Sequence, residues 1–97
     1  MPTVYIPTLL RTLTGGRDSV EVEGGTVRQV IENLEQAWPG IRERLLEEGK
    51  LRPNISVAID GEVTPMGLIE AVGPASEVHF IAAIKGGVST PTSYQRL

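Results

Sequence analysis

Few side chains in this sequence are of a type, and at a spacing, that could carry out chemistry. The single histidine, His79, stands beside Phe80, and no Ser–His–carboxylate or His–carboxylate spacing accompanies it. We therefore interpret His79 as a structural or surface residue rather than a catalytic base. The chain has no cysteine, which excludes a thiol nucleophile, a thiolate metal site and a disulfide bond. Glu43, Glu47 and Glu48 are typical of a solvated face and predict no metal site.

Two glycine pairs in the first quarter of the chain have the composition of turns. Neither Gly15–Gly16 nor Gly24–Gly25 begins a phosphate-binding glycine motif. The residue types alone therefore predict that the protein is not an enzyme. They also predict that it binds no ATP, metal ion or other cofactor by itself.

A third pair, Gly86–Gly87, follows the last strand-like run and precedes ten residues, from Val88 to Leu97. One interpretation is a flexible junction before a tail. The other is a reactive chain end, because a segment without side chains can enter a narrow channel in another protein. A terminal glycine carboxylate is also sterically free to attack the α-phosphate of ATP. The residues alone leave both interpretations open.

Composition limits the class of partner and the compartment. The formal net charge is −3, with only two lysines, Lys50 and Lys85, and seven arginines spread along the chain. An acidic chain without a basic stripe argues against nucleic acid as the main partner. The longest apolar run, Phe80 to Ile84, is far shorter than the roughly 18–20 residues that cross a membrane. With no cysteine to oxidise, the chain suits the cytoplasm.

The N-terminal half predicts two strands and a helix. A strand opens at residues 3–10, with Pro7 near its end, and a second strand covers residues 19–23 after a turn at residues 14–18. These two strands are expected to form a hairpin with a long connection. Thr26 is the predicted N-cap of an amphipathic helix, with Gln29 completing a capping box. Pro39 ends this helix, and one or two further helical turns follow until Gly49.

The C-terminal half predicts three further strands. Residues 54–60 alternate clearly, Asp60–Gly61 is a turn, and a short return strand starts at Val63. Residues 66–72 form a single helical turn or an irregular segment, and residues 76–84 form the last strand. This order predicts an α+β domain of β-grasp, ubiquitin-like topology, with a mixed four- to five-stranded sheet packed on one main helix.

Alternation along the first and last strands assigns their two faces. The side expected to face the helix comprises Val4, Ile6, Val78, Phe80 and Ala82. The open side carries Tyr5, Ile81 and Ala83, which, with Ile84 and Lys85 leading to the glycine pair, form the predicted partner-binding surface.

Four segments together resemble a known family: "YIPTLLRTLTGG", "LEQAWPGIRERLLEEGKLR", "ISVAIDGEV" and "FIAAIKGG". The sequence from Thr3 to Gly87 is similar to the MoaD/ThiS family of sulfur-carrier proteins, most of all to its CysO type. The glycine pair is specific to this family only in combination with the order of elements and the "PGIRERLL" segment.

The resemblance implies a carrier rather than an enzyme. Gly87, preceded by Gly86, would be the residue that is adenylated by an E1-like enzyme with ATP and Mg²⁺ and converted to a thiocarboxylate. The thiocarboxylate would donate sulfur to an acceptor, for the CysO type a pyridoxal-phosphate cysteine synthase. A metalloprotease of the JAMM type would release the product, and the carrier itself would be a monomer. Thiamin, molybdopterin and secondary-metabolite pathways remain alternative destinations of the sulfur.

The residues behind Gly87 depart from the family pattern. A mature carrier of this family stops at its second glycine, so the resemblance implies a carrier domain at residues 1–87 and a disordered extension at residues 88–97. Cleavage of the Gly87–Val88 bond would then precede activation. Two alternatives remain: a ubiquitin-like modifier joined to other proteins through Gly87, and an unprocessed β-grasp interaction module.

Overall fold

The computed structural model describes residues 1–82. Ala83, Ile84, Lys85, Gly86 and Gly87 lie outside the described residues, as does the Val88–Leu97 extension. For the predicted site, the structure therefore describes the strand that leads toward the glycine pair and the surfaces around that strand.

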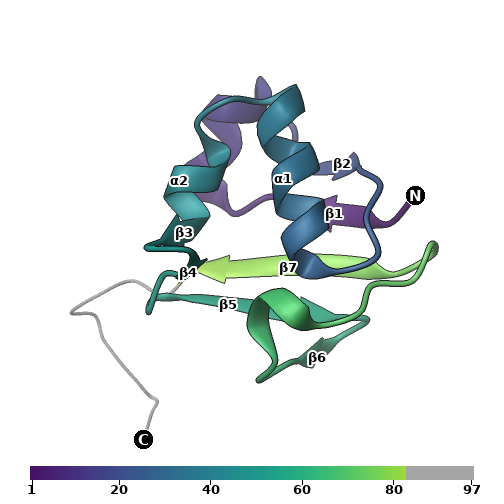
Figure 1. Cartoon of the computed structure of the whole chain (residues 1–97). Helices are drawn as coiled ribbons and strands as arrows, with labels where there is room; N and C mark the ends of the chain where they lie inside the picture. Colours follow the sequence, from purple (N-terminus) through teal and green to yellow (C-terminus); the bar gives the residue numbers. More distant parts are fainter. Residues whose placement is uncertain (83–97) are drawn as a thin grey trace, which may run out of the picture.

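The described chain is built from short strands and helices (Figure 1). The strands are β1 (Thr3–Tyr5), β2 (Ser19–Glu21), β3 (Leu46–Glu47), β4 (Lys50–Leu51), β5 (Ile55–Ile59), β6 (Glu62–Val63) and β7 (Glu77–Ala82). The α-helices are α1 (Val27–Ala37) and α2 (Ile41–Leu45), and the 3₁₀ helices are η1 (Thr8–Thr14) and η2 (Gly67–Ile69).

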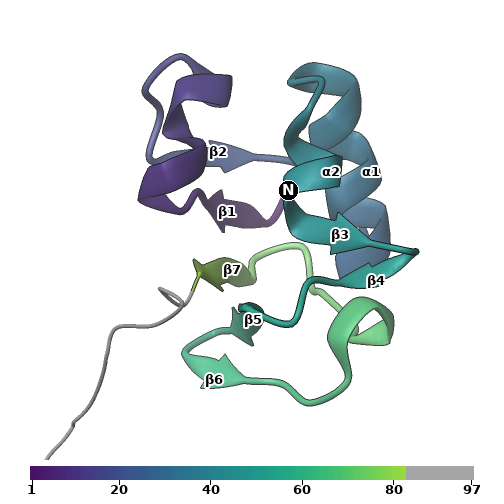
Figure 2. The same cartoon turned by 90° about the vertical axis from the view of Figure 1, so that its left-hand side faces the viewer.

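The main sheet has five strands in the order β2-β1-β7-β5-β6. The last strand, β7, lies in the centre, parallel to β1 and antiparallel to β5. The helices α1 and α2, the β3–β4 hairpin and η2 lie on one side of this sheet (Figure 2). The predicted mixed sheet with one main helix, arranged as a β-grasp, is thus confirmed.

Alternation along the strands places the core between the sheet and α1. Val4 pairs with both Val20 of β2 and Val78 of β7, so three valines from three strands lie side by side under the helix. From α1, Val27, Val30, Ile31 and Leu34 meet them, and all four are fully buried. Burying side chains of this kind stabilises the fold by about 1.5–3 kcal/mol each.

The start of α1 follows the predicted capping with one difference. The Thr26 Oγ1 atom accepts a hydrogen bond from the backbone N–H of Gln29 at 3.2 Å, as an N-cap does. The Gln29 Oε1 atom accepts from the N–H of Gly25 at 2.7 Å, not from that of Thr26. The Thr26 backbone instead lies at an isolated β-bridge with Ala71, so the capping box is displaced by one residue.

Two local predictions were wrong. The predicted first strand ends at Tyr5, because the chain after Pro7 turns into η1 instead of extending through the connection. Gly49 does not end a helix but forms, with Glu48, the turn of the β3–β4 hairpin. Both residues have positive φ, 54° and 78°, as a two-residue hairpin turn requires.

Candidate functional site

The candidate site begins at the C-terminal end of β7, since Gly87 is the fifth residue after Ala82. Residues on both neighbouring strands hold β7 in place: Thr3, Val4 and Tyr5 of β1 pair with Glu77, Val78 and His79, and β5 pairs with β7 as far as Ile55↔Ala82. The strand is thus paired on both sides as far as His79 and on the β5 side as far as Ala82, which fixes the base of the segment that leads to the glycine pair.

The open face of β7 carries aromatic and apolar side chains. The rings of Tyr5 and His79 stack with their centroids 4.1 Å apart and an angle of 3° between their planes. Ile81, two residues beyond His79 on the same face, is 46% exposed, whereas its neighbour Phe80 is 4% exposed. The structure therefore confirms the predicted faces and places Tyr5 and Ile81 on one surface; the role of that surface in binding partners stays a prediction.

His79 is half-buried and forms a stacked pair with Tyr5. It lies opposite Ala58 of β5 and Tyr5 of β1 in the sheet register. Among residues 1–82, no group of three or more histidine or acidic side chains is placed to hold a metal ion. No helix within the same range is long and apolar enough to span a membrane.

An apolar hollow of about 640 Å³ borders the end of β7. It is lined by Pro7, Thr8 and Leu9 from the start of η1 and by Phe80, Ile81 and Ala82 from β7. Leu9 is 75% exposed at its rim, and no charged side chain of the described chain lines it. Sequence reasoning missed Leu9, because residues 3–10 were predicted to be a strand, in which Leu9 has no distinctive position.

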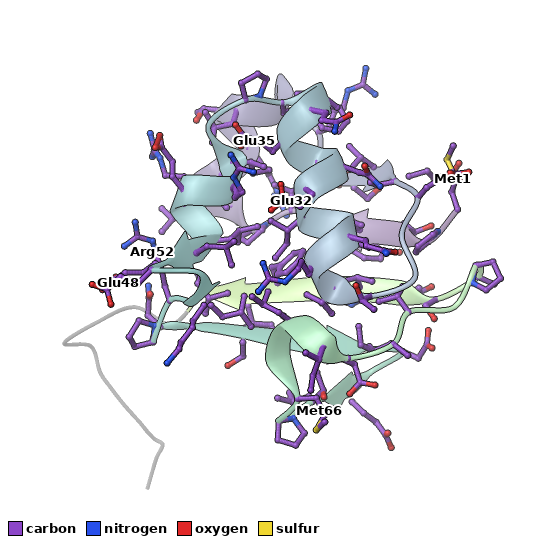
Figure 3. All side chains as sticks on the ribbon, viewed as in Figure 1. Met1, Glu32, Glu35, Glu48, Arg52 and Met66 are labelled. Carbon is purple, nitrogen blue, oxygen red and sulfur yellow. The ribbon has the colours of Figure 1, made fainter. Side chains whose placement is uncertain are left out.

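Glu35 sets the position of α2 beside α1 (Figure 3). Its carboxylate accepts hydrogen bonds from the backbone N–H groups of Gly40, at 3.1 Å, and Arg42, at 2.9 Å. These bonds, that from Arg42 foremost, lower the pKa of Glu35 below its ordinary value. The carboxylate thus satisfies N–H groups at the start of α2 that have no partner within the helix.

The fold and the open face define a ubiquitin-like β-grasp protein, and comparison with known proteins identifies its family. The sequence pattern of the ThiS family matches residues 4–87. The chain is 38% identical over 90 residues to the sulfur carrier protein CysO of Mycobacterium tuberculosis H37Rv, covering 88% of this chain and 97% of the relative. The chain therefore belongs to the ThiS family and is a CysO-like sulfur-carrier protein.

Solved structures agree with this assignment. A chain in the crystal structure of the Amycolatopsis orientalis BexX/CysO complex superposes with a TM-score of 0.85 at 39% identity, covering 90% of this chain and 100% of that one. The Haloferax volcanii small archaeal modifier protein 1 has a TM-score of 0.69 at 27% identity, covering 89% and 98% of the two chains. The family match ends at Gly87, so it includes the glycine pair and leaves out residues 88–97.

Proposed function

We propose that this protein is a sulfur-carrier precursor that is cleaved after Gly87 and then converted to a thiocarboxylate. The observation that carries the proposal is the end of the family match at Gly87, five residues beyond the central strand of a rigid β-grasp. A rigid body with a side-chain-free end suits a protein that must carry one reactive atom into the active sites of others.

The chemistry requires cleavage first. The carbonyl of Gly87 forms an amide with Val88 and has no free carboxylate oxygen with which to attack ATP. Water must hydrolyse this bond, leaving the Gly87 carboxylate and the free amine of Val88. Attack of the carboxylate on the α-phosphate of ATP then expels pyrophosphate, and hydrosulfide attacks the acyl carbon of the adenylate and displaces AMP, leaving the thiocarboxylate.

The catalytic groups belong to the partners. An E1-like enzyme with ATP and Mg²⁺ performs the adenylation, and a JAMM-type metalloprotease performs the cleavage. A cysteine synthase-like enzyme with pyridoxal phosphate receives the sulfur, which makes cysteine the first destination to test. The carrier acts as a protein co-substrate of these enzymes, in the cytoplasm and as a monomer.

We assign partner binding to the open face of β7 and to the residues that follow β7 in the sequence. Tyr5 and Ile81 form the described part, and Ala83, Ile84 and Lys85 continue the sequence toward Gly86 and Gly87. The adjoining hollow offers an apolar surface of the kind that marks protein interaction sites. The BexX/CysO complex of Amycolatopsis orientalis supports partner binding by a CysO-like protein, because there a CysO protein is found with a second protein.

A second candidate function is protein modification through Gly87. It is favoured by the similarity to the small archaeal modifier protein 1 of Haloferax volcanii, at 27% identity over nearly all of both chains. The same adenylate serves both fates, since a lysine amine and a sulfur nucleophile can each displace AMP.

Mass spectrometry of two chains tests the proposal. A chain ending at Gly87 and the full-length chain are each incubated with the activating enzyme, ATP and a sulfide source. We expect the mass gain of replacing one oxygen by sulfur on the shorter chain alone, and on the full-length chain only after the protease is added. If the shorter chain shows no such mass gain although the partner enzymes are active, the carrier function is contradicted. Branched peptides in which Gly87 is joined to other proteins would favour protein modification.

A further inference from the structure

A second hollow lies on the helix side of the sheet, between β4 and η2. It measures about 290 Å³ and is lined by α1, the β3–β4 turn, β4 and η2, through Arg28, Gly49, Lys50, Leu51, Met66, Gly67, Leu68 and Ile69. We call this the β4–η2 hollow. Met66 and Ile69 stand at its rim and are 53% and 68% exposed. Figure 3 shows Met66 on the outer side of η2, away from α1.

The charge of the β4–η2 hollow is opposite to that of the chain. The protein has a formal net charge of −3, yet the described residues lining this hollow include two cations, Arg28 and Lys50, and no acid. By contrast, the hollow beside β6 is lined by Asp60, Glu62 and Glu70. An acidic ligand is therefore repelled at β6 and attracted at the β4–η2 hollow.

Two carboxylates on the same helix or hairpin as these cations form ion pairs with other arginines. Glu32, one turn after Arg28 on α1, forms its ion pair with Arg42. Glu47, opposite Lys50 in the β3–β4 ladder, forms its ion pair with Arg52 at 3.1 Å. Within residues 1–82, neither Arg28 nor Lys50 takes part in an ion pair.

Arg28 is exposed, and its guanidinium reaches from α1 to the β3–β4 turn. Its Nη2 atom lies 3.4 Å from the carbonyl oxygen of Gly49, to which it donates a weak hydrogen bond. This contact joins α1 to the β3–β4 turn, and Lys50, the residue after Gly49, lines the same hollow. The remaining N–H groups of the guanidinium can still bind a carboxylate in bidentate fashion.

We propose that the β4–η2 hollow is a docking site for an acidic, apolar segment of a partner protein. An apolar side chain of that segment packs between Leu51 and the exposed Met66 and Ile69, and a carboxylate beside it meets Arg28 and Lys50. Methionine adapts its shape to irregular apolar ligands, which suits a rim residue. Two cations are too few to hold a nucleic acid or an anionic membrane, whose binding rests on many such contacts.

This site is separate from the open face of β7, because it lies on the opposite side of the sheet (Figure 2). A partner held here leaves Tyr5 and Ile81 free for another protein. The inference does not depend on cleavage at Gly87 or on thiocarboxylate chemistry, so the two proposals fail independently.

Peptide selection on the full-length protein tests the site. A display library of random peptides is selected against the wild-type chain, and the enriched peptides are synthesised and titrated by fluorescence anisotropy. We expect peptides that combine Asp or Glu with Leu, Ile or Phe. Their binding should weaken about tenfold in the Arg28→Glu/Lys50→Glu variant and fall with added salt, because exposed charge pairs are screened. Ile69→Ser should weaken it several-fold.

Two control variants outside the hollow test whether the loss of peptide binding is specific to the β4–η2 hollow. Val63→Ser removes an apolar side chain of similar exposure, 63%, outside the hollow, and Arg44→Glu reverses an exposed charge outside it. Both should leave peptide binding unchanged, and thermal unfolding checks that every variant is folded. Selection of no acidic and apolar peptide would overturn the proposal. So would equal binding to wild type and to the folded Arg28→Glu/Lys50→Glu and Ile69→Ser variants.

Discussion

The two faces of β7 differ in burial: one packs against the core and the other is open, although their side chains alternate along a single strand of six residues. On one face, Val78 and Phe80 are buried under α1 and hold the sheet to the helix layer. On the other, His79 stacks on Tyr5 and Ile81 is 46% exposed beside the apolar hollow at Leu9. The same strand thus anchors the domain and presents a surface, and substitutions on its two faces should have separable effects.

Phe80→Ala should give the largest effect on stability, because it leaves a cavity in the core. We expect the free energy of unfolding to fall by about 3–5 kcal/mol, as for other buried aromatic residues. Ile81→Ala, on the other face of the same strand, should cost about 1 kcal/mol or less. Urea unfolding followed by the fluorescence of Trp38 measures both. Similar losses for the two variants would show that the faces are not distinct.

Ile81→Glu should affect partner binding and leave the fold intact. A charge on the open face meets water rather than the core, but it opposes burial against an apolar partner surface. The rate of adenylation of the Gly87-ended chain should fall about tenfold, equivalent to ~1.4 kcal/mol. Val63→Glu, an exposed apolar position at the sheet edge, serves as the control and should keep the wild-type rate. An unfolded Ile81→Glu variant would contradict the face assignment.

Glu35→Gln should lower the stability of the protein by loosening α2 from α1. The neutral amide accepts hydrogen bonds from the N–H groups of Gly40 and Arg42 less strongly than the carboxylate does. The pKa of Glu35 is lowered in the folded protein, so its stabilising effect is present above the ordinary value of 4.5 and is lost as the pH falls through the folded pKa. The melting temperature of Glu35→Gln should thus be below that of wild type at neutral pH, and the difference should shrink in acid. If the difference in melting temperature between wild type and Glu35→Gln stays the same from neutral to acid pH, the charge of Glu35 does not contribute to stability.

Removal of residues 88–97 should have the smallest effect. The sequence of the extension, VSTPTSYQRL, has neither apolar periodicity nor a bulky apolar cluster, so we expect it to add little to the core. We expect the free energy of unfolding to change by well under 1 kcal/mol. A larger change in urea unfolding would show that the extension packs on the domain, and would contradict the division at Gly87.

The sequence predicted best the features that depend on a long, regular pattern. The apolar stripe of α1 and its Thr26 cap are in the structure, and the alternation in "EVHFIA" assigned both faces of β7 correctly. The β3–β4 hairpin was missed because each strand has two residues, too few to show alternation, and its turn places a glutamate, Glu48, at positive φ. The hollow at Leu9 was missed because it depends on how η1 packs beside β7, which is a tertiary contact.

The central position of β7 also determines when the protein can fold. Residue pairs such as Thr3↔Glu77 join the first strand of the chain to the last described strand, and such distant pairing makes folding slower than in helical proteins. During synthesis, β1 and β5 lack their shared neighbour until residues 77–82 have left the ribosome. The sheet is therefore completed only in chains whose translation has passed this strand, so β1 and β5 come together last, late in synthesis.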